Sequence, residues 1–217
     1  MRSTQWASPS TLRSGELSNL TQSPQAAERS CGDCTLCCTV LRVDALRKLG
    51  GVACAAVSAR GCTIYERRPQ ICRGYRCLWL QGKLDIEDRP DRLGAVLDVV
   101  VEAGAARLAI REATRGAFER SDRLRAIAER YRDAMPVRIT CASDALAAAA
   151  PERVLLARGE ELAIAGDVAV RLRGGREVER VRARWLERAA RRLRLAWQRR
   201  RVRGYGDGAQ AIRENGA

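Results

Sequence analysis

The sequence of 217 residues contains no histidine. This absence excludes a Ser-His-Asp triad, a Cys-His nucleophile pair and any imidazole metal ligand. Lysine is almost missing as well, because Lys48 and Lys83 are the only two among forty basic residues. A serine nucleophile activated by lysine therefore has few possible partners. Together these shortages argue against hydrolase chemistry.

Long apolar runs are also missing. No run approaches the roughly 18–20 residues that cross a bilayer, and residues 1–30 are rich in Ser, Thr and Gln without the apolar stretch of a secretory signal. We expect a disordered segment over 1–30 and a cytoplasmic protein with no transmembrane segment. In the cytoplasm disulfides are rare, and clustered cysteines more often indicate metal binding or redox chemistry.

Negative charge is scarce at one end of the chain. Residues 171–203 hold fourteen arginines against three glutamates, which is +11 of the total formal charge of +14. The remainder of the chain is close to neutral. Any electrostatic partner is therefore expected at the carboxyl end.

Cysteine, by contrast, is abundant and localised. Eight of the nine cysteines lie within 47 residues, in the pattern C-x2-C-x2-C-C followed by C-x7-C-x9-C-x4-C. A C-x2-C loop turns two sulfurs to the same side, and a third cysteine three residues later lets the backbone wrap around one metal or cluster. The predicted metal ligands are Cys31, Cys34, Cys37, Cys38, Cys54, Cys62, Cys72 and Cys77.

The spacing predicts two four-thiolate sites or one polynuclear site, in which the later four cysteines complete what the first four begin. Cys37 and Cys38 are neighbours whose side chains diverge, so the two should not serve one site in the same way. Four thiolates suit zinc and iron–sulfur clusters alike, and the metal stays open between zinc and iron. A disulfide framework and plain buried cysteines are the alternatives. The ninth cysteine, Cys141, is interpreted as a small core residue.

Two stretches of this region resemble a known family. The string Cys31-Gly-Asp-Cys-Thr-Leu-Cys-Cys38, followed by Gly61-Cys-Thr-Ile-Tyr-Glu-Arg-Arg-Pro-Gln-Ile-Cys-Arg73, is similar to the YkgJ-like CxxCxxCC cysteine-cluster family. The stretch from Trp79 to Asp98 looks like the continuation in some members. The resemblance implies a zinc- or iron-chelating domain that uses the eight cysteines. Flagellin lysine N-methylases carry a similar cluster, which makes a metal-dependent protein-modifying enzyme an alternative by kinship.

The rest of the chain predicts an α+β fold. We expect a metal-knotted, cysteine-rich N-terminal half with a cysteine-cluster domain over 31–80, and a body over 81–172 that packs with it and combines helices with a small antiparallel sheet. Two apolar runs, 93–101 and 107–111, predict a hairpin. Ser121 is expected to cap a helix that Pro136 stops, and a strand follows at 137–140. Runs at 154–157 and 162–170 predict a second hairpin, and the acidic residues between 85 and 91 are interpreted as a solvated turn.

The carboxyl end is predicted to form a long Arg-rich amphipathic helix over 173–203 and a flexible tail over 204–217. Its apolar stripe comprises Val178, Val181, Trp185, Ala189, Leu193 and Ala196. The stripe could pack on the body, leaving the arginines solvated. Alternatively the helix could bind an acidic protein, nucleic acid or an anionic membrane surface. The functional hypotheses are thus a metal-binding protein with a structural, buffering or redox role, a metal-dependent enzyme, and a nucleic-acid-binding module.

Overall fold

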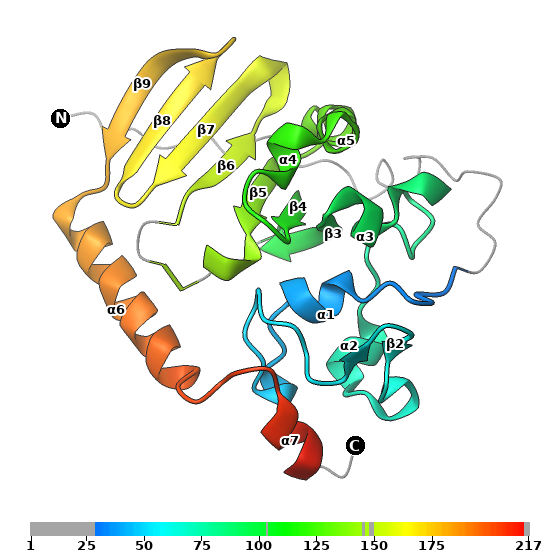
Figure 1. Ribbon diagram of the computed structural model, residues 1–217. Helices are drawn as coiled ribbons and strands as arrows, with labels where there is room; N and C mark the ends of the chain where they lie inside the picture. Colours follow the sequence, from blue (N-terminus) through cyan, green and yellow to red (C-terminus); the bar gives the residue numbers. More distant parts are fainter. Residues whose placement is uncertain (1–28, 103, 145, 148–149, 215–217) are drawn as a thin grey trace.

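The computed structural model describes residues 29–102, 104–144, 146–147 and 150–214 (Figure 1). Residues 1–28 of the predicted disordered segment lie outside this range. The described chain is of the predicted α+β class. Short helices and loops of the cysteine-rich region lie on one side and a sheet with its helices on the other, and helix α6 (Trp185–Arg201) runs along the edge between them.

The described residues form one mixed sheet of seven strands in the order β3-β4-β5-β6-β7-β8-β9. Neighbouring strands are antiparallel except β4 and β5, which are parallel and are connected through helices α4 and α5. The strands are β3 (Ala95–Glu102), β4 (Ala105–Glu112), β5 (Val137–Cys141), β6 (Glu152–Leu155), β7 (Glu160–Ala165), β8 (Val168–Arg173) and β9 (Arg176–Arg182). The sheet is therefore larger than predicted and not purely antiparallel.

The centre of this sheet follows the sequence pattern. The predicted hairpin is confirmed as β3 and β4, which pair from Ala95↔Glu112 to Glu102↔Ala105. The cap at Ser121 is also confirmed, because its hydroxyl accepts a hydrogen bond from the Leu124 backbone at 3.1 Å. Helices α4 (Ala117–Arg120) and α5 (Asp122–Arg132) cover this part of the sheet. Their buried side chains pack with those of β3, β4 and β5 in the main hydrophobic core: Leu97, Leu108, Ile110, Phe118, Leu124, Ile127 and Val137.

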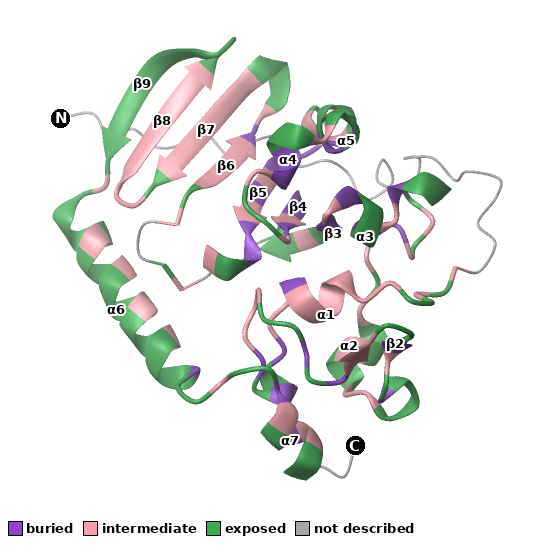
Figure 2. Ribbon diagram, in the orientation of Figure 1, coloured by how far each residue is buried: buried purple, intermediate pink, exposed green. Residues whose placement is uncertain are grey.

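Two predictions for the carboxyl half are wrong. The predicted strand 162–170 is two strands, β7 and β8, because Gly166 has a positive φ and turns the chain. The predicted helix 173–203 begins only at Trp185, and residues 176–182 form edge strand β9. Gly174 and Gly175 both have positive φ, which is the conformation that a tight hairpin turn requires. Strand β9 is exposed along its whole length (Figure 2).

The cysteine-rich region is built from short elements. Its helices are α1 (Leu36–Val40), α2 (Gln70–Gly74) and α3 (Pro90–Leu93), and its hairpin pairs β1 (Val57–Ser58) with β2 (Gly61–Cys62). Single 3-10 turns are η2 (Asp44–Leu46), η3 (Tyr65–Arg67) and η4 (Ile86–Asp88), with η5 (Ala142–Asp144) and η6 (Ala157–Gly159) in the body. Two small apolar clusters, separate from the main core, hold this region together.

The tail predicted to be flexible is folded onto the cysteine-rich region over its described part, up to residue 214. The carbonyl oxygens of Gly206 and Asp207 accept hydrogen bonds from the backbones of Leu49 and Ala55, at 3.0 and 2.9 Å. Helix α7 (Ala209–Glu214) follows, and its Ile212 packs against one of the apolar clusters. The prediction failed because the partners of this tail lie more than 150 residues away in the sequence.

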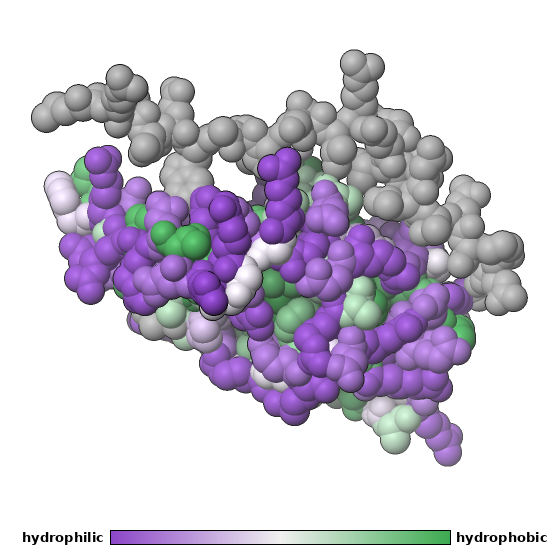
Figure 3. All heavy atoms as spheres, turned by 90° about the horizontal axis from the view of Figure 1, so that it is seen from above, coloured by the Kyte–Doolittle hydropathy of each residue, from purple (hydrophilic) through white to green (hydrophobic). Residues whose placement is uncertain are grey.

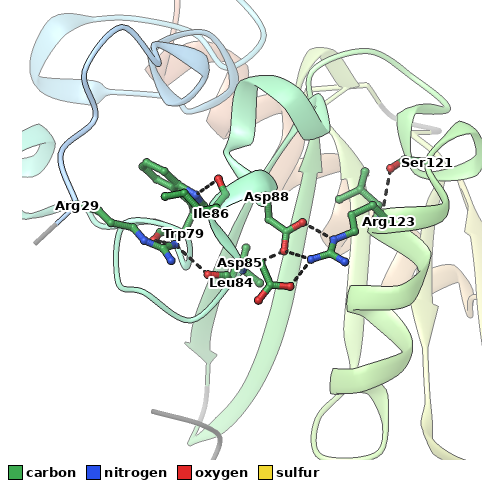
Figure 4. Close-up of polar contacts among 9 residues, drawn as sticks. Arg29, Trp79, Leu84, Asp85, Ile86, Asp88, Ser121 and Arg123 are labelled. Atoms are coloured by element: carbon green, nitrogen blue, oxygen red, sulfur yellow. Dashed lines mark hydrogen bonds and ion pairs between the residues drawn. The ribbon is translucent and has the colours of Figure 1, made fainter. Parts of the chain in front are cut away.

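Polar contacts hold the segment 79–88 and join it to helix α5 (Figure 4). Asp88, which is 0% exposed, accepts hydrogen bonds from Arg123 of α5 at 2.5 and 3.1 Å. Arg29 donates to the carbonyl oxygens of Trp79 and Leu84, both at 2.9 Å. The acidic stretch 85–91 is therefore not simply a solvated turn, because one of its carboxylates is a buried ionic partner of α5.

Hydrophilic residues dominate the face of the molecule seen in Figure 3.

Candidate metal centre

All eight predicted cysteines line one cavity of about 530 Å³. They reach it from the loop before α1, from α1 itself, from the loop at 54, from β2, from α2 and from the loop at 77. Residues up to 46 positions apart thus share one space. Cys141 is elsewhere, buried with its sulfur 3.3 Å from the hydroxyl of Ser143, which agrees with its interpretation as a core residue.

The first four cysteines are placed by a tight loop and the start of a helix. The Cys34 N–H donates to the carbonyl of Cys31 at 2.9 Å and closes the C-x2-C loop. Arg89, just before α3, holds this loop from outside through Asp33 at 2.7 Å. Cys37 and Cys38 lie within α1, where successive side chains point about 100° apart. The two side chains therefore leave the helix in different directions, although their thiols still come close enough for a hydrogen bond.

The later cysteines are brought in by contacts distant in sequence. The Cys54 N–H donates to the carbonyl of Cys38 at 3.1 Å. Cys62 sits in the β1–β2 hairpin next to Gly61, whose φ is +110°. A Cβ atom at Gly61 would stand 2.9 Å from the carbonyl oxygen of Gly32, so the hairpin lies directly against the first loop. Cys72 lies in α2, and its N–H donates to the carbonyl oxygen of Pro69, the residue just before the helix, at 2.9 Å.

The eight sulfur atoms form no disulfide among the described residues and are spread over the cavity wall. All nine cysteines lie in the described part of the chain, and each is a free thiol. Within the described ranges, no three cysteine, aspartate, glutamate or histidine side chains stand together at the spacing of metal ligands. The described chain thus brings eight sulfur donors to one cavity, but the donors do not converge on a single metal position.

The thiols differ in their electrostatic surroundings. Burial raises the pKa of five of them: Cys31, Cys34, Cys54, Cys72 and Cys77. A hydrogen bond between the side chains of Cys37 and Cys38 raises the pKa of Cys37 and lowers that of Cys38. Lys48 and Arg68 further lower the pKa of Cys38, which favours its thiolate form.

Lys48 is a site residue that the sequence reasoning missed. Its side chain is 0% exposed and its Nζ donates to the carbonyl oxygens of Thr39, Leu41 and Leu49, at 3.1, 2.6 and 2.8 Å. It lines the cysteine cavity and places a positive charge near Cys38 and Cys54. Its rarity as one of two lysines in an arginine-rich chain was the only signal in the sequence.

Arg68 supplies a second cation at the cavity wall. Its guanidinium stacks on the ring of Tyr65, 3.6 Å from the centroid. Its Nε is buried without a hydrogen-bond partner in the described structure. A buried donor of this kind, at the edge of a cavity lined by cysteines, suits a site that carries negative charge.

Comparisons with protein-family models, with curated proteins and with solved structures give no significant match to this chain.

Proposed function

We propose that this protein binds zinc or iron, the latter as ions or an iron–sulfur cluster, through its eight clustered cysteines. The observation that carries the proposal is the single cavity onto which all eight reduced thiols open. A donor set made only of sulfur suits both metals. The resemblance of residues 31–38 and 61–73 to the YkgJ-like CxxCxxCC family points to the same chemistry.

The donor set fits such a metal, and the first role of binding is structural. The cysteine-rich region has short helices and one two-residue hairpin, with little regular hydrogen bonding to hold its segments together. A bound metal would supply cross-links between those segments, so its binding free energy becomes folding free energy. Lys48 and Arg68 would offset the negative charge of the thiolates. Bound metal would in this way cross-link the segments of the cysteine-rich half.

The test is anaerobic purification followed by elemental analysis and a visible absorption spectrum. Colourless protein with bound zinc, or brown protein with iron and sulfide, supports the proposal. Cys54→Ser should reduce the bound metal, whereas Cys141→Ser should leave it unchanged, although both cysteines are buried. Protein that holds no metal when purified without chelators, and takes up none on reconstitution, would contradict it.

We also propose that the protein works in a reducing compartment such as the cytoplasm. Metal binding by these cysteines requires them to stay as thiolates, and all nine are free. None of the described helices is long and apolar enough to cross a membrane. Expression of the chain in an oxidising compartment should give disulfide-linked protein with little metal, as seen by thiol counting.

A second candidate function belongs to α6. The apolar stripe of this helix does not pack on the body: Trp185, Leu193 and Trp197 are 68%, 72% and 58% exposed. The half-buried residues are instead Arg188, Arg191, Leu195 and Gln198, on the opposite side of the helix. Arg191 donates to the carbonyl of Gly166, which fixes this orientation. The helix is thus amphipathic with its apolar side turned to solvent.

We propose that this outward side of α6 binds an anionic membrane surface. Exposed arginines accompany the stripe, among them Arg192, Arg194 and Arg200. A cationic helix with tryptophan and leucine on one side matches the boundary between lipid headgroups and acyl chains. Nucleic acid would meet the arginines but leave Leu186 and Leu193 in water. If α6 of a second copy of the chain bound this side instead, the arginines of the two helices would repel each other.

Cosedimentation with vesicles tests this candidate. Binding to phosphatidylcholine vesicles that contain phosphatidylglycerol, with little binding to pure phosphatidylcholine and a steep loss with salt, is expected. Leu193→Glu should weaken binding at least tenfold. Val101→Glu, which adds the same charge at an exposed valine of β3, should not. Equal binding by both variants, no binding to either vesicle, or tight binding only to single-stranded DNA or an acidic protein would overturn it.

A further inference from the structure

We propose that the eight cysteines form two separate four-thiolate sites, and that α1 divides them. This inference rests on the proposed metal-binding function and adds the assignment of each ligand. The first site comprises Cys31, Cys34, Cys37 and Cys77. The second comprises Cys38, Cys54, Cys62 and Cys72.

Apolar packing separates the two sets. Cys38, Cys54, Cys62 and Cys72 all belong to one cluster, built around residues such as Leu46 and Ile64. Cys37 and Cys77 pack instead in another cluster, with Val40 of α1 and Val96 of β3. No cysteine belongs to both of these clusters as the described residues form them. Cys37 and Cys77 therefore reach the cavity from a different wall than the four cysteines of the second set.

Helix α1 explains why the division falls between neighbours. Cys37 and Cys38 differ by one helical step of about 100°, so one side chain turns toward β3 and the other toward the loop at 54. The Cys38 carbonyl accepts the Cys54 N–H at 3.1 Å, which places Cys54 on the side of Cys38. The Leu78 N–H donates to Leu97 of β3 at 2.8 Å, which holds Cys77 on the side of Cys37.

The two sets meet where Cys37 and Cys38 adjoin on α1.

Four thiolates are the complete set for one tetrahedral zinc ion or one iron–sulfur cluster. Each set supplies four thiolates, so neither site needs a ligand from the other set. Each set also joins the C-x2-C-x2-C-C segment to a later part of the chain: Cys77 alone closes the first site, whereas Cys54, Cys62 and Cys72 close the second. Loss of one later cysteine should therefore empty one site and spare the other.

Metal counting on single variants tests the assignment. Zinc-reconstituted protein should hold about two ions per chain, and Cys72→Ser and Cys77→Ser should each hold about one. The double variant should hold none, and Cys141→Ser should still hold two. Loss of all metal in either single variant would indicate one shared cluster and overturn the division. A wild-type protein that binds no metal would instead remove the proposed function itself.

A measurement on the wild-type chain covers the case in which a variant does not fold. The metal-free protein is reconstituted with cadmium-113, and its NMR signals are correlated with cysteine Hβ protons. Two signals are expected, one coupled to Cys31, Cys34, Cys37 and Cys77 and the other to the remaining four. A cysteine coupled to both signals, or coupling between the two cadmium ions, would show a bridged cluster and overturn the proposal.

Discussion

The Nζ atom of Lys48 lies 2.6 Å from the carbonyl oxygen of Leu41, and no part of the lysine side chain reaches solvent. Two more carbonyls, those of Thr39 and Leu49, accept from the same ammonium group. The lysine thereby fixes the chain that follows α1 while it places a cation beside the cysteine cavity. One residue serves both the local fold and the electrostatics of the site.

Lys48→Met should therefore destabilise the protein by about 3 kcal/mol, because three partly buried carbonyl groups each lose a hydrogen bond and the cavity loses a positive charge. Lys83→Met is the matched control, since Lys83 is the other lysine and is exposed. Chemical denaturation of the metal-loaded protein measures both. Equal stability of the two variants would show that Lys48 is not a structural cation.

Gly208 controls the docking of the tail. Its φ is +85°, and a Cβ atom there would stand 2.8 Å from the carbonyl oxygen of Leu46. Gly208→Ala should cost about 2 kcal/mol through backbone strain and this contact, and should expose the tail to protease. Gly206→Ala is the control, because Gly206 has open space around it and lacks a positive φ. Similar rates of tail cleavage in both variants would contradict the docking.

The ion pair between Arg123 and Asp88 should be sensitive to the loss of one partner. Asp88 is 0% exposed, so Arg123→Met leaves a buried carboxylate that, among the described residues, keeps only the Asp85 N–H as a hydrogen-bond donor, at 3.1 Å. We expect a loss of about 3 kcal/mol. On the same helix, Arg125→Met removes an exposed pair with Asp122 and should cost no more than about 0.5 kcal/mol. Thermal unfolding compares the two, and an equal cost would refute the role of burial.

Sequence patterns were informative where the structure depends on neighbours in the chain. The β3–β4 hairpin, the Ser121 cap and the isolation of Cys141 all follow from local residue types. A C-x2-C loop constrains only its own geometry, whereas Cys54 reaches the same cavity through a backbone contact with Cys38 that the spacing does not predict. The metal and the assignment of ligands stay predictions.

The orientation of α6 could not be predicted in the same way. An amphipathic pattern identifies an apolar stripe but does not say which side of the helix meets the body. Here the contacts with the body come from Arg191 on Gly166 and Arg199 on Leu146, whose carbonyls are far away in sequence. The start of the helix depends instead on a local signal, because Gly174-Gly175 forms the turn between β8 and β9.

Removal of metal should loosen only part of the molecule. The cysteine-rich region and the tail share one small apolar cluster, which includes Ile212, whereas β3, β4, β5 and α5 have a core of their own. After chelation, amide hydrogen exchange should therefore accelerate over 31–77 and 205–214, while Leu108, Ile110 and Ile139 stay protected. Restored protection on returning zinc is the control. Uniform acceleration through the sheet would mean that metal and main core form one cooperative unit, and unchanged exchange over 31–77 would mean that the cysteine-rich region folds without metal.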